Sequence, residues 1–190
     1  MDTLSMLLLA LSTTADSMII GLNYGIKQVR VSNISNLFIS LVCLVGTYAA
    51  MQSGRMLGSY LYSGFCDFLG GAALAAFGLI TLTRALFFNE KKSLANNPEA
   101  VDKDNSKIIE LRESVIVGFL LSLNNMGVGI AAGIAGFSVV ITPSICAVAS
   151  FLFIKTGCTL GKKISGTRIS YILELLSASL LLWLGIFNLV

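Results

Sequence analysis

Six apolar segments, each long enough to cross a lipid bilayer, account for most of this 190-residue chain. A helix needs about 20 mainly apolar residues to span the hydrocarbon layer. Because the segments are continuous rather than alternating, they predict helices and exclude a membrane β-barrel. The fold class is therefore an all-α membrane protein with six transmembrane helices. The predicted spans are Leu4–Gly25, Ile34–Gly54, Tyr60–Thr83, Ser114–Gly136, Val139–Leu160 and Ser170–Val190.

The composition excludes several classes of protein. Charged residues make up 12% of the chain and the mean hydropathy is +0.84, whereas a soluble domain has about 25% charged residues. The net charge of +3 is too small to suggest a nucleic-acid partner, and the absence of histidine removes histidine-based metal sites. The four cysteines form no CxxC pair and are interpreted as core residues. The first apolar segment exceeds the core of a signal peptide, which predicts a retained helix.

Lysine and arginine predict the orientation, because they accumulate in cytoplasmic loops. With six spans, eleven basic residues fall on one side and only Arg55 on the other, while Lys155 lies inside the fifth span near its basic end. Both termini are therefore expected outside, in a multi-pass protein of the bacterial cell membrane. The polar segment 88–113 is then a cytoplasmic linker between residues 1–87 and residues 114–190. The eleven basic residues are Lys27, Arg30, Arg84, Lys91, Lys92, Lys103, Lys107, Arg112, Lys162, Lys163 and Arg168.

Asp16 is the only charged residue between Leu4 and Gly25. A carboxylate at mid-membrane costs about 2.5–3.5 kcal/mol by insertion measurements, so such residues are functional by default. A structural interpretation remains open, in which Asp16 is hydrogen-bonded to Ser12, Thr13 or a neighbouring helix.

The two halves of the chain match at several positions, one set in each helix. Because each half has three spans, the second half must enter from the opposite face, which predicts a 3+3 inverted-topology repeat. Such repeats are a recurring plan of transporters, with the binding site near the midplane at the repeat interface. The aligned pairs are Asp16–Ile26 with Asn124–Ile134, Gly54–Gly58 with Gly157–Gly161, and Asp67 with Glu174.

The predicted metal path uses the polar residues that this alignment pairs. At about 1.5 Å rise per residue, Asp16 and Asn124 both lie near the midplane. Asp67 lies roughly 10 Å from the outer face and Glu174 roughly 6 Å from the inner face. Together with Asn125 they offer oxygen ligands, which suit hard cations such as Mg²⁺, Ca²⁺ and Mn²⁺. The alternatives are interhelical hydrogen bonds for the two asparagines and contact with water or lipid headgroups for the two acids.

Small residues recur every fourth position in the first and fourth spans, which lets helix backbones approach closely. We expect these two spans to cross there and to bring Asp16 near Asn124. The stripes are Thr13, Ser17, Gly21 and Gly25 in the first span, and Asn125, Gly129 and Gly133 in the fourth.

Two motifs then give a resemblance. TADSM at residues 14–18 and SLNNMGVG at residues 122–129 resemble the paired S-x-D motifs of MntP-type manganese efflux pumps. The closest branch is that of the sporulation membrane proteins of spore-forming Gram-positive bacteria. The resemblance implies Mn²⁺ export by a six-helix membrane protein, with Glu174 as the acid of the sixth helix. The chain departs from the family at Asn124, which replaces the second aspartate, and at Thr47, which replaces an acid of the second helix.

Two functions therefore compete. The first is a secondary transporter that exports a divalent cation, Mn²⁺ foremost, with no resident cofactor. The second is a membrane protein required for sporulation that does not transport. An intramembrane enzyme is not expected, because the chain has neither a GxGD motif with paired acids nor paired reactive cysteines.

Overall fold

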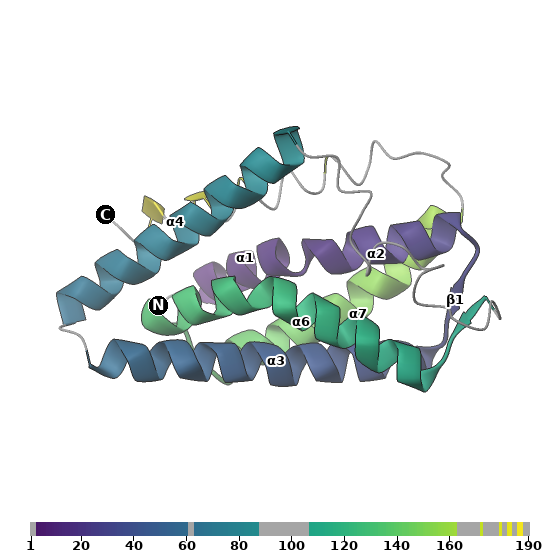
Figure 1. The fold of residues 1–190 in the computed structure, drawn as a ribbon, viewed down its shortest axis with the longest axis horizontal. Helices are drawn as coiled ribbons and strands as arrows, with labels where there is room; N and C mark the ends of the chain where they lie inside the picture. Colours follow the sequence, from purple (N-terminus) through teal and green to yellow (C-terminus); the bar gives the residue numbers. More distant parts are fainter. Residues whose placement is uncertain are drawn as a thin grey trace.

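The computed structural model describes residues 3–60, 63–87 and 107–162, with a few isolated positions nearer the C-terminus. These residues form an elongated bundle of helices, in which α2 and α7 run in one direction and α3 and α6 in the other (Figure 1). Two short strands, β1 and β2, pair in parallel at one end, with Arg30 opposite Ile108. The elements are α1 Thr3–Thr13, α2 Ala15–Ile26, β1 Arg30–Val31, α3 Asn33–Ser59, α4 Ser63–Phe87, β2 Ile108–Ile109, α6 Leu111–Ile134 and α7 Ile141–Gly161.

The helices confirm the class of helical membrane protein. Within the described residues, three segments are long and apolar enough to cross a membrane, namely Leu4–Ile26, α3 and α7, and a fourth is α6 if its bent halves form one span. The third predicted span corresponds to α4, Ser63–Phe87. The sixth predicted span lies almost wholly outside the described residues.

The structure describes only the last residues of the predicted linker 88–113. Residues 88–106 lie outside the described part of the chain, but Ile108 and Ile109 form β2. Helix α6 begins at Leu111 because Glu110 and Glu113 form a capping box, in which the Glu110 N–H donates to Glu113 Oε2 at 3.1 Å. Such a reciprocal cap satisfies N–H groups that a helix start leaves unpaired.

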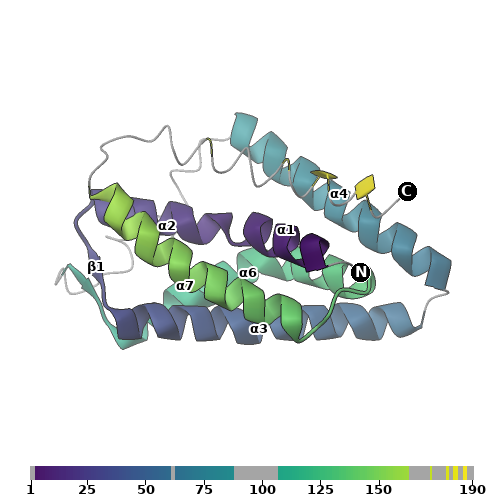
Figure 2. The same ribbon diagram turned by 180° about the vertical axis from the view of Figure 1, so that it is seen from behind.

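Two close helix pairs dominate the packing. Helix α2 lies against α7, and α3 lies against α6, as Figures 1 and 2 show from opposite sides. In both views α2 and α6 run in opposite directions, as do α3 and α7.

The glycine stripes make these two contacts, so the expected crossing of the first and fourth spans through them is wrong. A Cβ added at Gly25 would lie 2.5 Å from the Cys158 carbonyl oxygen of α7. At Gly133 it would meet the Met51 carbonyl oxygen of α3. A stripe of small residues predicts a close approach but does not say which helix approaches.

The two contacts correspond residue by residue. Gly161 of α7 packs on Leu22, and Gly54 of α3 packs on Ile130, the residue 108 positions after Leu22. The contacts therefore pair Gly54 with Gly161. The sequence alignment had paired Gly54 with Gly157, which is one helical turn away.

The C-terminal ends of α2 and α6 have the same cap. The Val29 N–H donates to the Tyr24 carbonyl at 2.9 Å, and the Phe137 N–H donates to the Ala132 carbonyl at 3.0 Å. Each cap contains one residue with positive φ, Gln28 at 59° and Gly136 at 80°. This left-handed residue reverses the chain and lets later N–H groups reach carbonyls of the last turn.

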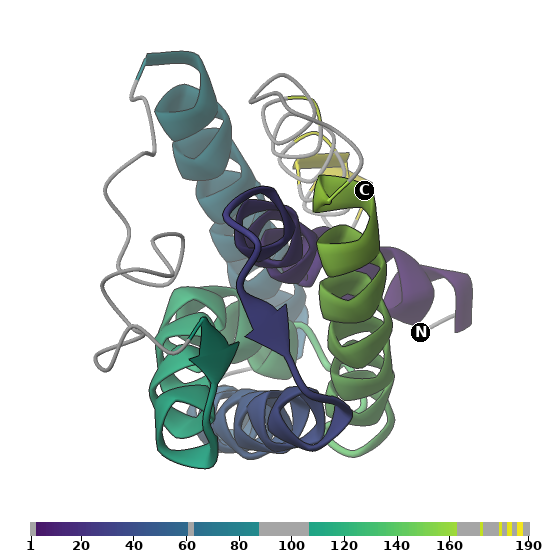
Figure 3. The same cartoon turned by 90° about the vertical axis from the view of Figure 1, so that its right-hand side faces the viewer.

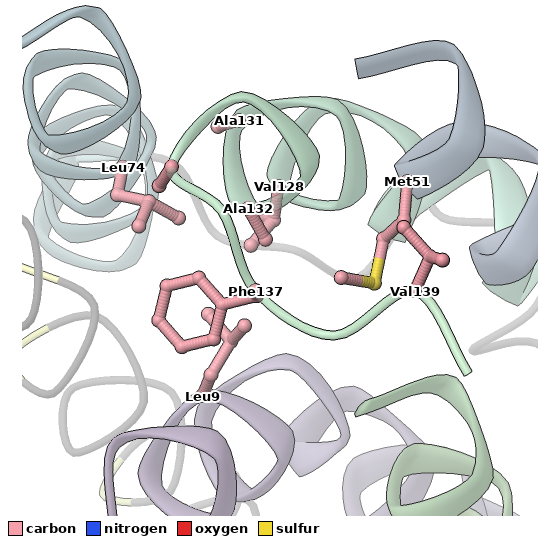
Figure 4. Close-up of a cluster of buried hydrophobic side chains, with 9 residues drawn as sticks. Leu9, Met51, Leu74, Val128, Ala131, Ala132, Phe137 and Val139 are labelled. Carbon is pink, nitrogen blue, oxygen red and sulfur yellow. The ribbon is translucent and has the colours of Figure 1, made fainter. Parts of the chain in front are cut away.

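Each cap delivers an apolar side chain into a core cluster at its own end of the bundle. Phe137 inserts between Leu9 of α1 and Leu74 of α4 (Figure 4). At the other end Val29 packs with Tyr24 and Ile20. At one end the large side chain is Phe137, which follows the cap. At the other end it is Tyr24, which lies within the helix, and the residue after the cap is the smaller Val29. Both clusters are therefore filled, although the large residue lies on a different side of the cap in each.

Candidate functional site

The first predicted span is interrupted between α1 and α2, two residues before Asp16. Hydroxyl groups at this interruption donate to carbonyls of the preceding turn, and the Ala10 carbonyl also accepts the Thr14 N–H at 3.0 Å. Ser12 Oγ donates to the Leu9 carbonyl at 2.9 Å, and Thr14 Oγ1 donates to the Ala10 carbonyl at 2.6 Å. Serine and threonine bonded to the preceding turn bend helices, and inside a membrane they satisfy freed backbone groups. The SerThrThr run therefore explains why the break occurs here.

Asp16 lies in the first turn of α2 and is half-buried. Its Oδ1 accepts the Ser17 N–H at 2.8 Å. The carboxylate lies close enough to Cys43 of α3 and to Cys146 of α7 to interact with both thiols electrostatically. A negative charge is stabilised at a helix N-terminus, where the N–H groups carry positive partial charge. The break thus provides a favourable position for an acid within an apolar span.

A small cavity lies beside this break, between α1, α3, α6 and α7. Its volume is about 10 Å³, which is near the minimum that one water molecule needs. Four of its lining residues present hydroxyl or amide groups: Thr13, Thr47, Asn125 and Thr142. Thr142 Oγ1 is buried without a hydrogen-bond partner among the described residues. Most of the cavity surface is nonetheless apolar, so these polar groups lie around the cavity rather than open into it.

Two polar contacts join the first span to α7 around this cavity. The hydroxyls of Ser17 and Ser150 lie 2.8 Å apart and are buried. Thr13 Oγ1 lies 3.6 Å from Cys146 Sγ. Ser17 follows Asp16 directly, so these contacts fix the orientation of the first turn of α2 against α7.

The fourth span also changes direction at its predicted site residue. Helix α6 bends by 48° between Leu123 and Asn125, at Asn124. Asn125 is buried and lines the cavity. The side chain of Asn124 lies outside the described part of the structure, so its distance from Asp16 stays untested. The cavity nonetheless brings together Thr13, just before the break in the first span, and Asn125, just after the bend in the fourth.

The two predicted flanking acids are less well defined. Asp67 lies in the backbone of α4, but its side chain is outside the described residues, and Glu174 is outside them altogether. Sequence reasoning did not identify Thr13, Thr142 and Cys146 as lining residues, and it named Thr47 only as a departure from the family. Thr47 carried the strongest available signal, since it is a polar residue within a long apolar span.

The site is poor in charge. Within the described residues, no three acids or cysteines cluster as a ready metal-binding group. Asp16 therefore contributes a single carboxylate to surroundings of hydroxyl, amide and thiol groups. Neutral oxygens of this kind are ligands of hard metals, but the cavity in this structure has room for no more than about one water molecule.

Comparisons with known proteins agree with the motifs. The model of a family described as "Putative manganese efflux pump" matches residues 1–82. The "Probable sporulation protein YtaF" of Bacillus subtilis (strain 168) is 29% identical over 214 aligned residues, which cover the whole of both chains. No solved structure matches the chain. The resemblance is therefore confirmed: this helical membrane protein is similar to the manganese efflux pump family through residues 1–82 and to a sporulation protein over its full length.

Proposed function

We propose that this protein is a secondary transporter that exports a divalent cation, with Mn²⁺ as the first candidate. The observation that carries the proposal is the helix break that places Asp16 at an N-terminus inside a membrane span, close to a small cavity whose lining includes four residues with hydroxyl or amide groups. Interrupted helices near the midplane are a common site of ion binding in transporters. The ion and the direction of transport come from the similarity of residues 1–82 to efflux pumps.

The proposed architecture is six spans in a 3+3 inverted repeat, with residues 1–87 and 114–190 as the repeats and 88–113 as the linker. The matched contacts support it. The packing of Gly25 against α7 corresponds to that of Gly133 against α3, and the packing of Gly161 against α2 corresponds to that of Gly54 against α6. The identical helix caps and the opposite helix directions support it further. Two similar pairs can then exchange roles as the cavity opens to one side or the other.

In the proposed path the ion binds at the centre to Asp16, Asn124 and Asn125. Asp67 would receive or release it towards the outer face, and Glu174 towards the inner face. One carboxylate neutralises only half of a divalent charge, so we expect the ion to keep part of its water shell. The cavity of about 10 Å³ would have to widen to admit the ion with those waters, and weak binding at the centre favours release.

The basic end of the bundle, with β1 and β2, is proposed to face the cytoplasm of a bacterial cell. Arg30, Lys107, Arg112 and Lys162 lie there, while Arg55 lies at the opposite end of α3. Both termini are then outside. The proposal assigns no catalysis to the protein, because the matched family is one of efflux pumps rather than enzymes.

Flux in proteoliposomes tests the proposal. Purified protein is reconstituted, and the movement of Mn²⁺, Ca²⁺, Mg²⁺ and Zn²⁺ is followed with a trapped indicator. We expect Mn²⁺ flux in the unmodified protein and background flux in Asp16→Asn. Asp102→Asn is the matched control, since it makes the same chemical change in the polar segment 88–113, outside the predicted spans. Absence of flux for all four ions would refute transport, and equal flux in Asp16→Asn would refute the site.

A second function follows from the similarity to a probable sporulation protein over the whole chain. In that case the protein supports sporulation without moving ions, and the amide at Asn124 marks a lost site. Replacing the chromosomal gene with the Asp16→Asn variant separates the two functions. Normal sporulation with no flux in the unmodified protein supports the second, whereas joint loss of flux and sporulation supports transport.

A further inference from the structure

A second and larger cavity lies at the basic end of the bundle, away from Asp16. Its volume is about 390 Å³, within the range of small-molecule clefts. It lies between β1, the first turn of α3 and the last two turns of α7. Figure 3 looks onto this end, where β1 runs from α2 to α3 beside α7. The lining includes Arg30, Ser32, Asn36, Lys155, Thr159 and Lys162.

The charge of this cavity selects an anion. Arg30, Lys155 and Lys162 come from two different elements and are all exposed. No acidic residue lines the cavity among the described residues, and none of the three cations has an ion pair there. The N-terminus of α3 adds the positive end of a helix dipole on the same side, capped by Ser32. Basic pockets between transmembrane helices on the cytoplasmic side are a common site for phosphate-bearing headgroups.

Asn36 adds a hydrogen-bond requirement to the positive charge of the cavity. Its side chain is only 3% exposed, and its Nδ2 donates to the Phe151 carbonyl of α7 at 2.8 Å. This bond fixes the amide so that Oδ1 is the free atom, and Oδ1 has no hydrogen-bond partner in the described part of the chain. An unsatisfied buried acceptor costs about 1–3 kcal/mol. The cavity therefore suits a guest that also brings a donor.

We propose that this cavity binds a glycerol phosphate group, with the phosphate on Arg30, Lys155 and Lys162 and a glycerol hydroxyl donating to Asn36 Oδ1. A neutral hydroxyl fits better than an ammonium group as the donor, because three cations surround the cavity. The group can belong to a phosphatidylglycerol headgroup in the cytoplasmic leaflet or to a soluble glycerol phosphate. Neither role involves the ion path at Asp16.

Native mass spectrometry of the full-length protein in detergent tests the proposal. Three lipids are compared: phosphatidylglycerol, phosphatidylmethanol with the same charge but no headgroup hydroxyl, and neutral phosphatidylcholine. We expect affinity to fall in that order. Soluble glycerol phosphate is added as a competitor. Displacement of the lipid identifies a site open to the soluble ester, and retention identifies a lipid site; both support the proposed chemistry. Equal binding of all three lipids would overturn it.

Variants assign the effect to the cavity. Arg30→Gln and Lys155→Gln should each lower phosphatidylglycerol affinity about fivefold, because one basic residue at a membrane surface contributes about that factor. Arg112→Gln removes a cation at the same end but outside the cavity, and should leave affinity unchanged. Asn36→Leu should abolish the preference for phosphatidylglycerol over phosphatidylmethanol. Lys155 is exposed, so Lys155→Gln can be tested even if Asn36→Leu lowers the protein yield. An equal loss of phosphatidylglycerol affinity in Lys155→Gln and Arg112→Gln would refute the site.

Discussion

The α2–α7 contact and the α3–α6 contact have nearly the same backbone geometry but different chemistry. In each, glycines bring the helices together, and three of them match: Gly21, Gly25 and Gly161 of the first contact correspond to Gly129, Gly133 and Gly54 of the second. In the first contact an acid, Asp16, precedes the buried pair of Ser17 and Ser150. At the corresponding positions of the second contact the chain has Asn124, Asn125 and Cys43. The backbone arrangement is thus duplicated, while the negative charge is present in only one copy.

This difference indicates which features the two halves need in common. Glycine spacing and caps set how helices pack, so a change in either copy distorts the bundle. The charged residue is needed once if a single ion binds at the shared cavity. A second acid would hold a divalent cation more tightly and slow its release.

The strongest test of the comparison exchanges the charge between the two copies. Asp16→Asn should reduce ion flux to background, because the centre then has no negative charge. Asn124→Asp, with Asp16 kept, should raise the apparent affinity for Mn²⁺ at least tenfold, since a second carboxylate a few ångströms from the ion adds more than 1.4 kcal/mol of attraction. Flux and binding titrations in proteoliposomes measure both effects. Equal loss of flux in the two variants would show that the copies do not differ as proposed.

The next test asks whether the two contacts contribute equally to folding. Gly25→Ala and Gly133→Ala each place a methyl group against a backbone carbonyl of the partner helix. Each should lower stability by about 1–3 kcal/mol, the usual cost of overpacking. Thermal unfolding in detergent measures the change. Ala49→Val, on the exposed face of α3, is the control and should be nearly neutral. A loss in only one of the two glycine variants would argue against matched contacts.

The sequence predicted the membrane class and most helix positions, because long apolar runs without charge leave a spanning helix as the main solution. It also predicted close packing at Gly21, Gly25, Gly129 and Gly133. The predicted partner helices were wrong, because a stripe of small residues shows which face of a helix packs closely but not which helix packs against it. The β1–β2 pair was missed, because two-residue strands leave no periodic pattern to detect.

The site was predictable only where a residue conflicts with its surroundings. Asp16 stood out as a charge within an apolar span, and Asn124 stood out through the repeat. Thr142 and Cys146 are ordinary residues of an apolar helix in the sequence. They become part of the cavity because α7 packs against α1, which is a tertiary contact and leaves no local signal.

The caps allow a smaller test in which the two copies should respond with opposite signs. Gln28 holds a left-handed backbone that costs a non-glycine residue about 1–2 kcal/mol. Gln28→Gly should therefore stabilise the protein by up to about 1 kcal/mol, after the greater flexibility of glycine in the unfolded chain is subtracted. Gly136→Ala should destabilise it by about 1–2 kcal/mol, although no atom lies within 4 Å of the added methyl group. These changes correspond to roughly 2–8 °C in Tm for a chain of this size. Shifts of the same sign would show that the two turns do not act as equivalent caps.

The smallest expected effect concerns the polar pair that only the first contact contains. Ser17 and Ser150 share a buried hydrogen bond between α2 and α7. In membrane proteins such bonds average about 0.6 kcal/mol in double-mutant cycles, because the separated helices find other partners. Ser17→Ala, Ser150→Ala and the double variant should therefore give a coupling near that value. Ser17→Ala with Ser53→Ala is the control cycle and should be additive, because Ser53 is exposed and bonds only its own helix. A coupling of zero would mean that backbone packing at the glycines alone holds α2 on α7. Asp16 would then owe its orientation to the helix break rather than to the serine pair beside it.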